Sequence, residues 1–64
     1  MKYPHIKVKL VGTDGNAFAI LGKVINAMRR NGCTEEQIME FRTEATSGDY
    51  DKLLATCMDY VEVC

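Results

Sequence analysis

The segment IKVKLVGTDGNAFAIL, residues 6–21, joins two hydrophobic patterns of different period and decides the fold class. Within Tyr3–Val11, the apolar residues Ile6, Val8 and Leu10 alternate with polar ones, which is typical of a strand with one buried face. After the glycines, apolar residues recur every three or four positions, as in an amphipathic helix. The segment therefore predicts a strand that leads through a glycine-rich loop into a helix.

The helix after this loop is expected to begin at a cap, Asn16 or Asp14, and to end near Arg30. Two apolar stripes run along it, and we expect both to be buried. The first stripe consists of Phe18, Leu21, Ile25 and Met28, and the second of Ala17, Ile20, Val24 and Ala27. Asn31-Gly32 follows, and glycine readily adopts the left-handed conformation that ends a helix.

Two further helices are expected after this stop. Thr34 and Gln37 have the spacing of a capping box, and Ser47-Gly48 would end the helix that they begin. Asp49 is the next N-cap, and the apolar residues after it keep helical spacing to about Asp59.

Residues 60–64 either extend the last helix or leave it, because they alternate and are rich in β-branched side chains. In the second case they would form a short C-terminal strand that pairs with the first. The predicted class is α+β, with one N-terminal strand, three amphipathic helices and this short strand.

The length of 64 residues leaves room for one core, so residues 1–64 are expected to form a single small α/β domain. Domains of this size commonly need disulfides, a metal or a partner chain for secure stability. The three cysteines cannot all pair within one chain. We therefore expect reduced thiols and a homo-oligomer.

The net charge of −1 hides an uneven distribution. Residues 1–33 carry six bases and one acid, which gives +5, whereas residues 34–64 carry two bases and eight acids, which gives −6. This asymmetry favours either an anion site on the first half or head-to-tail contacts between copies. We expect a cytoplasmic protein without a membrane partner, because no export signal and no apolar run of roughly 20 residues are recognisable.

The loop between the first strand and the first helix is the candidate ligand-binding site, with Gly12, Thr13, Asp14, Gly15 and Asn16 as its residues. Backbone N–H groups and the positive end of a helix dipole together hold phosphate or carboxylate groups. Lys7, Lys9 and Lys23 would reinforce such a site. The full phosphate-loop and dinucleotide motifs are absent. The alternative is a tight turn whose glycines only satisfy backbone geometry.

Patterns for catalysis, metals and nucleic acid are weak. His5 is the only histidine and no nucleophile setting is recognisable, so we assign no catalytic residue and expect no enzyme, with a pairing of His5 and Cys57 or Cys64 as the open alternative. The cysteine spacing matches no metal motif, and we expect neither a metal nor a cofactor. Four glutamates on the second helix would repel phosphates, which disfavours nucleic acid.

Two segments, GTDGNAFAILG (Gly12–Gly22) and EATSGDYD (Glu44–Asp51), resemble a family of very short uncharacterised proteins of phages, prophages and bacterial genomes. The resemblance extends from about Val8 to Val63. That family has no established activity or site, so no functional residue is transferred. The resemblance implies a freestanding small protein of mobile elements that acts in a bacterial host cell by binding a host protein or sequestering a small molecule.

We therefore expect a non-enzymatic binding protein that captures a phosphorylated or nucleotide-like ligand at the loop, for signal sequestration or counter-defence. The alternative is a protein-protein interaction module, a host-protein inhibitor, that uses its acidic second helix.

Overall fold

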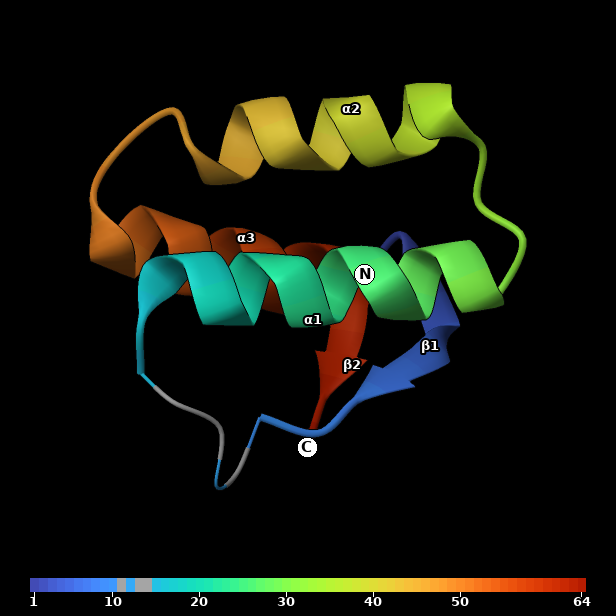
Figure 1. The fold of residues 1–64 in the computed structure, drawn as a ribbon, viewed down its shortest axis with the longest axis horizontal. Helices are drawn as coiled ribbons and strands as arrows, with labels where there is room; N and C mark the ends of the chain where they lie inside the picture. The colour runs from blue at the N-terminus through green and yellow to red at the C-terminus, as the bar shows by residue number, and fades with distance from the viewer. Residues whose placement is uncertain (11, 13–14) are drawn as a thin grey trace.

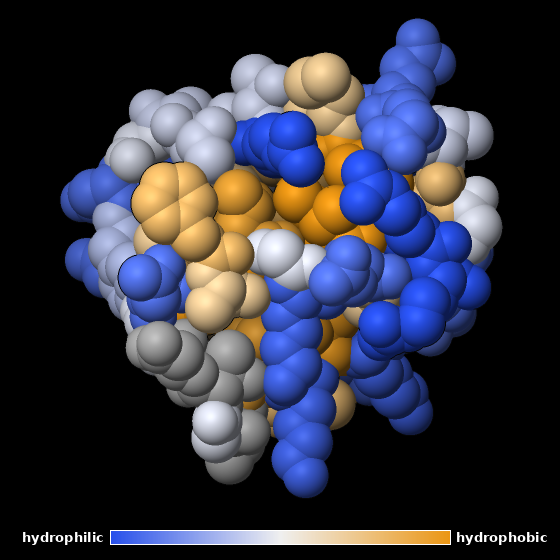
Figure 2. Space-filling model, viewed as in Figure 1, coloured by the Kyte–Doolittle hydropathy of each residue, from blue (hydrophilic) through white to orange (hydrophobic). Residues whose placement is uncertain are grey.

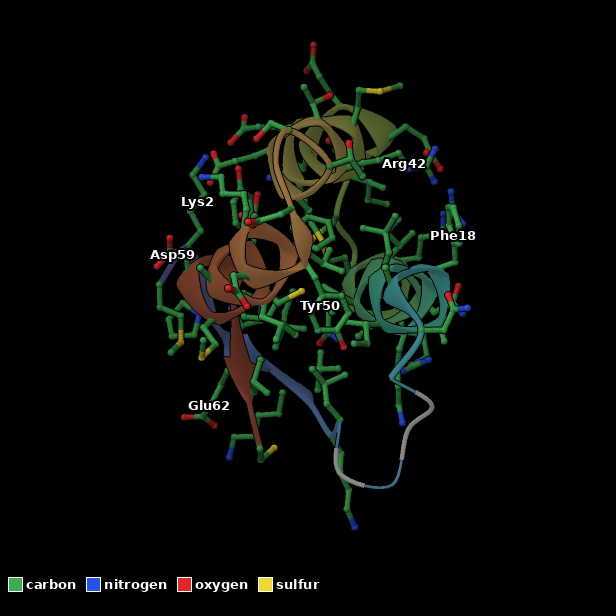
Figure 3. The ribbon with its side chains drawn as sticks, turned by 90° about the vertical axis from the view of Figure 1, so that its left-hand side faces the viewer. Lys2, Phe18, Arg42, Tyr50, Asp59 and Glu62 are labelled. Carbon is green, nitrogen blue, oxygen red and sulfur yellow. The ribbon has the colours of Figure 1, made fainter. Side chains whose placement is uncertain are left out.

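The computed structural model describes residues 1–10, 12 and 15–64. The elements follow one another as β1 (Tyr3–Val8), α1 (Ala17–Arg30), α2 (Glu35–Ala45), α3 (Tyr50–Tyr60) and β2 (Val61–Val63). α1 and α3 lie side by side, α2 covers one side of this pair, and the strands lie on the opposite side (Figures 1 and 3). The predicted α+β class is confirmed, including the C-terminal strand.

The two strands pair in parallel, so the two ends of the described chain meet in one small sheet. Tyr3 lies opposite Val61 and Val8 opposite Val63, with an irregular register between them. The prediction that β1 reaches Val11 is wrong for its described part, because the strand ends at Val8. Its partner strand has only three residues, so little remains for a longer β1 to pair with.

The helix boundaries follow the capping signals. Asn16, rather than Asp14, is the N-cap of α1. Thr34 caps α2 in a complete capping box, and Asp49 accepts a hydrogen bond from the first turn of α3. At the end of α1, Gly32 has φ of 84°, the left-handed conformation in which glycine is favoured. These predicted boundaries are confirmed.

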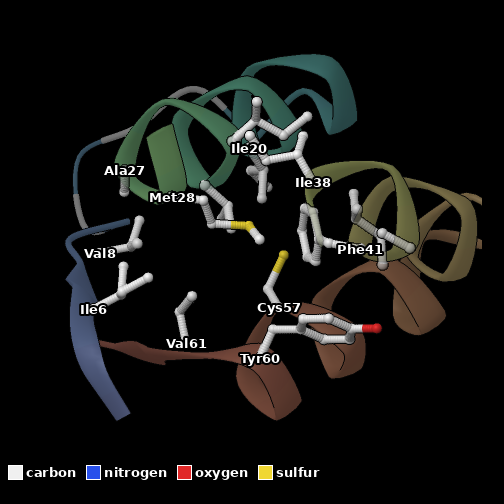
Figure 4. Close-up of a cluster of buried hydrophobic side chains, with 14 residues drawn as sticks. Ile6, Val8, Ile20, Ala27, Met28, Ile38, Phe41, Cys57, Tyr60 and Val61 are labelled. Atoms are coloured by element: carbon white, nitrogen blue, oxygen red, sulfur yellow. The ribbon is translucent and has the colours of Figure 1, made fainter. Parts of the chain in front are cut away.

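The core lies between the three helices and the sheet (Figure 4). Its largest fully buried side chains are Phe41, Ile6, Met28, Val24, Val61, Thr56 and Cys57. The buried residues of α2 are Ile38, Phe41 and Ala45, which form one line along the helix. Cys57 points into the core beside Met28 and Phe41, and burial raises the pKa of its thiol.

One stripe of α1 departs from its prediction. Ile25 and Met28 are buried and Leu21 is half-buried, but Phe18 is 83% exposed. Ala17 of the second stripe is exposed too. Burial therefore decreases toward the N-terminal end of α1, where α2 no longer covers it.

Candidate functional site

The glycine loop predicted as the ligand site is described in part. Gly12 is exposed and has φ of 80°, and Gly15 and Asn16 are exposed as well. Thr13 and Asp14 lie outside the described residues. Because a positive φ favours glycine, the backbone geometry at position 12 is enough to account for that residue.

Hydrogen bonds within the chain occupy polar groups of Gly15 and Phe18 at the start of α1. The side chain of Asn16 accepts a hydrogen bond from the N–H of Phe18 at 2.8 Å, so this amide is taken. The Tyr50 hydroxyl in α3 donates to the carbonyl of Gly15 at 2.7 Å. The first turn of α1 carries no acidic side chain, so the positive end of the helix dipole is not neutralised from within that turn.

The three lysines predicted to reinforce the loop lie in separate places. Lys7 is on β1, and its Nζ lies 3.8 Å from Oε2 of Glu62 on the neighbouring strand. Lys9 is exposed just beyond the end of β1. Lys23 is exposed on α1, seven residues from the cap, which corresponds to about 10 Å along a helix axis. Among the described residues, the loop residue Gly15 thus has a hydrogen bond with Tyr50, whereas Lys7 pairs with Glu62 on β2.

The charge asymmetry of the sequence is partly balanced within one chain. The ion pairs between described residues are Lys2–Glu40, Lys7–Glu62 and Arg29–Glu35. Each of them joins the basic first half of the chain to the acidic second half. The fold therefore uses some of the charges that favoured an anion site or head-to-tail contacts.

One side of the molecule is a closed polar and aromatic cluster, which we call the Tyr60 cluster and define as Lys2, Tyr3, Glu40, Glu44 and Tyr60. The Lys2 ammonium pairs with Glu40 and lies 5.1 Å from the centroid of the Tyr60 ring. The Tyr60 hydroxyl donates to Glu40 at 3.2 Å and reaches Glu44 at 3.5 Å. Because these groups already have partners, the cluster closes the fold and offers no open site.

The ionisation of the Tyr60 cluster follows from these contacts. The hydrogen bond from Lys2 holds the pKa of Glu40 below its ordinary value, and the same contact raises the pKa of Lys2. Burial, followed by the charge of Glu44, raises the pKa of Tyr60. The ionic form of the pair and the neutral form of the phenol are therefore favoured in the folded protein.

The opposite side carries an apolar groove, which we call the Phe18 groove, and it consists of two adjoining hollows. The first, of about 250 Å³, is lined by Ala17, Phe18, Leu21, Ala45, Thr46, Gly48, Asp49, Tyr50 and Leu53. The second, of about 420 Å³, is lined by Phe18, Leu21, Gly22, Ile25, Arg42 and Thr46. Figure 2 shows apolar surface recessed between α1 and α2 on this face, with polar residues around it.

The groove exists because α2 is short and its end is followed by small residues. α2 ends at Ala45, and Thr46 and Gly48 then lead the chain into α3. The Thr46 side chain is small and Gly48 has none, so they do not cover the first two turns of α1, and the Phe18 ring lies uncovered at the border of both hollows.

The two ends of the Phe18 groove differ in charge. Arg42 lines only the second hollow, and Asp49 lines only the first. Within the described part of the chain, the Arg42 side chain forms no ion pair. The Asp49 carboxylate accepts the capping hydrogen bond from the backbone N–H of Lys52 at 3.0 Å. Phe18 and Arg42 project from the same side of the molecule, away from Lys2 and Glu62 (Figure 3).

Sequence reasoning did not identify the Phe18 groove. It placed Phe18 in a buried stripe, which is wrong, because periodicity shows which face of a helix is apolar but not how much of it a neighbour covers. The available signal was the small-residue segment Thr46–Gly48, which separates α2 from α3.

The described residues contain no group of three or more His, Cys, Asp or Glu side chains placed to hold a metal ion. Cys33 is half-buried, Cys57 is buried and Cys64 is exposed, and all three are free thiols. No helix in residues 1–10, 12 and 15–64 is long and apolar enough to cross a membrane.

Comparison of the chain with protein-family models, with curated proteins and with solved structures gives no match.

Proposed function

We propose that this protein is a non-enzymatic binding protein whose contact surface for other polypeptides is the Phe18 groove. The observation that carries the proposal is an aromatic ring that is 83% exposed at the border of two apolar hollows. Isolated exposed apolar side chains are common on protein surfaces. A projecting ring next to apolar receptacles is the arrangement found at the centre of protein interfaces, where aromatic residues fill pockets on the partner.

The Phe18 groove is better suited to this role than the acidic face of α2. Glu35 pairs with Arg29 and Glu40 with Lys2, and Glu44 lies within reach of the Tyr60 hydroxyl. A partner that docked on these carboxylates would have to compete with contacts inside the chain. We therefore propose a protein-interaction module, as the sequence predicts, but with the Phe18 groove in place of the acidic face of α2 as its contact surface.

Photocrosslinking from inside the groove tests this function. Phe18 is replaced by a benzophenone amino acid, which keeps an aromatic ring at the site, and the protein is irradiated in its host cells. The matched control carries the same amino acid at Met58, which is 56% exposed and does not line the groove. We expect discrete adducts from position 18 and not from position 58. Equal yields from both positions, or none from position 18, would contradict the proposal.

Capture of a phosphorylated or nucleotide-like ligand at the glycine loop is the second candidate. It is favoured by the exposed Gly12, Gly15 and Asn16 at the start of a helix whose first turn has no acid. The pair of Lys7 with Glu62 is not an obstacle, because exposed ion pairs contribute little and Lys7 could exchange Glu62 for a phosphate.

Calorimetry with a panel of nucleotides tests this second candidate. We expect heat of binding that is lost in Lys7→Ala and kept in Lys52→Ala, since Lys52 is an exposed lysine on α3 and not part of the loop. Silence across the panel at millimolar concentrations would eliminate it. In the phage setting that the resemblance implies, either kind of binding would act on the host by stoichiometric capture.

A further inference from the structure

The two hollows of the Phe18 groove have a common centre and different ends. Phe18, Leu21 and Thr46 line both hollows. Arg42 belongs only to the second hollow and Asp49 only to the first. The groove is therefore ordered from an acidic end through an aromatic centre to a basic end.

We propose that the occupant of the Phe18 groove is a second copy of this chain, related to the first by a twofold axis that passes close to Phe18. This proposal rests on the proposed function and names the partner for the same surface. In a twofold interface each surface patch meets itself, so a patch must be its own complement. Both the shape and the charge of the groove meet this requirement.

The shape provides a projecting ring and a receptacle on the same face. Phe18 projects beside a hollow of about 250 Å³ on one side and about 420 Å³ on the other. A cavity of about 150 Å³ lined by apolar residues is enough to bind benzene. A twofold axis beside Phe18 brings the ring of each copy over a hollow of the other, so that both rings leave water together.

The charges complement each other under the same rotation. A twofold axis that crosses the groove at its centre, at right angles to its length, exchanges its ends, so Arg42 of one copy comes to lie over Asp49 of the second copy, and the reverse. Arg42 forms no ion pair with any described residue of its own chain. The Asp49 carboxylate has a second oxygen that can accept from a guanidinium while the first caps α3.

The size of the chain makes such an interface consequential. One copy has a surface of 4029 Å², and a standard interface covers about 800 Å² on each partner, about a fifth of that surface. Small domains of this kind gain stability from a partner chain, and the gain makes the melting temperature depend on concentration. A heterologous amphipathic helix in the groove is the competing occupant, and the tests below separate the two.

Sedimentation equilibrium of the full chain tests the shape of the interface. We expect a monomer–dimer equilibrium and a melting temperature that rises with concentration. Phe18→Ser should weaken dimerisation by about a hundredfold or more, because symmetry removes both rings at once. Met58→Ser replaces another exposed apolar side chain, which lies outside the groove, and should leave the dimerisation constant unchanged. A wild-type chain that stays monomeric at millimolar concentration, or equal effects of the two variants, would overturn the proposal.

Charge exchange tests the orientation. Arg42→Glu and Asp49→Arg should each prevent self-association, whereas an equimolar mixture should form a heterodimer in which both cross-pairs are restored. Asp49→Arg also removes the cap of α3, so Asp49→Asn is the control, because asparagine caps a helix as well as aspartate does. Asp49→Asn should stay folded by circular dichroism and dimerise more weakly. A mixture that remains monomeric while both variants are folded excludes the twofold arrangement.

The crosslinking experiment distinguishes this inference from the function on which it rests. A position-18 adduct at twice the chain mass supports a second copy. Adducts with other polypeptides only, together with a monomeric wild-type chain, overturn the dimer and leave the proposed function in place. The absence of any adduct at position 18 removes both.

Discussion

Phe41 and Phe18 are the only phenylalanines of the chain, and they occupy opposite environments. Phe41 is fully buried, and its ring lies edge-on to Tyr60 at a centroid distance of 5.2 Å, behind the Tyr60 cluster. Phe18 is 83% exposed in the Phe18 groove. Both belong to apolar stripes of amphipathic helices. The difference shows that an apolar stripe is buried only as far as the neighbouring element extends over it.

The strongest way to break this comparison is to truncate both rings. Phe41→Ala should cost about 3–5 kcal/mol of the free energy of unfolding, because it leaves a cavity in the core. A domain of this length has a total of roughly 3–10 kcal/mol, so the variant should lose about a third or more of its stability and unfold if the total is near the lower end. Phe18→Ala should change the value by less than about 0.5 kcal/mol at concentrations where the chain is monomeric. Urea unfolding followed by circular dichroism measures both, and similar losses would refute the contrast.

The two tyrosines offer a gentler test of the same contrast. Tyr60→Phe removes a hydroxyl that donates to Glu40 within the Tyr60 cluster and should cost about 1 kcal/mol. Tyr50→Phe removes an exposed hydrogen bond to Gly15 beside the groove and should cost less than about 0.5 kcal/mol. A larger loss for Tyr50→Phe in the same urea titration would mean that the groove side contributes more to stability than we infer.

Stability and binding should separate at Gly22. This residue lies inside α1, and a Cβ added there meets no atom within 4 Å beyond its chain neighbours and the helix's own backbone, so Gly22→Ala should stabilise the fold by about 0.5–1 kcal/mol. Gly22 lines the second hollow, so the added methyl group should also take up room there and weaken dimerisation. Ala19→Gly, an exposed position of α1 outside the groove lining, is the reverse control. It should lower stability without changing the dimerisation constant, and urea unfolding with sedimentation will show whether the two effects separate.

The smallest expected effect is the pH dependence of the Tyr60 cluster. The folded pKa of Glu40 is lowered from 4.5 by Lys2, so its contribution to stability is present above about pH 4.5 and is lost as the pH falls through the lower folded value. The raised pKa of Lys2 has the opposite sense, and its contribution is lost as the pH rises above 10.5.

Glu40→Gln should therefore flatten the acid limb of the stability profile, whereas Glu36→Gln, at an exposed position of the same helix, should not. The effect is small because exposed ion pairs are screened by solvent. Melting temperatures of the two variants between pH 3 and 7 test this expectation. The same decrease of the melting temperature with falling pH in both variants would contradict it.

Local signals determined most of the fold in advance. The helix ends depend on contacts within a few residues, and the residues that make them are recognisable in the sequence. They are the pair Thr34 and Gln37, the N-cap Asp49, and Asn31-Gly32. The exposure of Phe18 depends on elements far along the chain, on where α2 ends and on the small residues after it. The partners of the lysines are likewise set by the three-dimensional arrangement, as the pair between Lys7 and Glu62 shows.

The sequence also does not show whether the glycine loop, residues 12–16, binds a ligand. A glycine-rich turn looks alike in sequence whether it serves a ligand or only backbone geometry, and Gly12 with its positive φ fits both. Nothing local in the sequence distinguishes these cases.

The parallel pairing of β1 with β2 has a consequence for the order of folding. Tyr3 and Val61 are 58 positions apart (61−3), so closing the sheet costs more chain entropy than forming any of the helical turns. We expect the helices to assemble first and the strands to pair last, so the sheet is not part of the folding nucleus. Conservative truncation of Val61 should then accelerate unfolding and leave the refolding rate nearly unchanged in stopped-flow experiments.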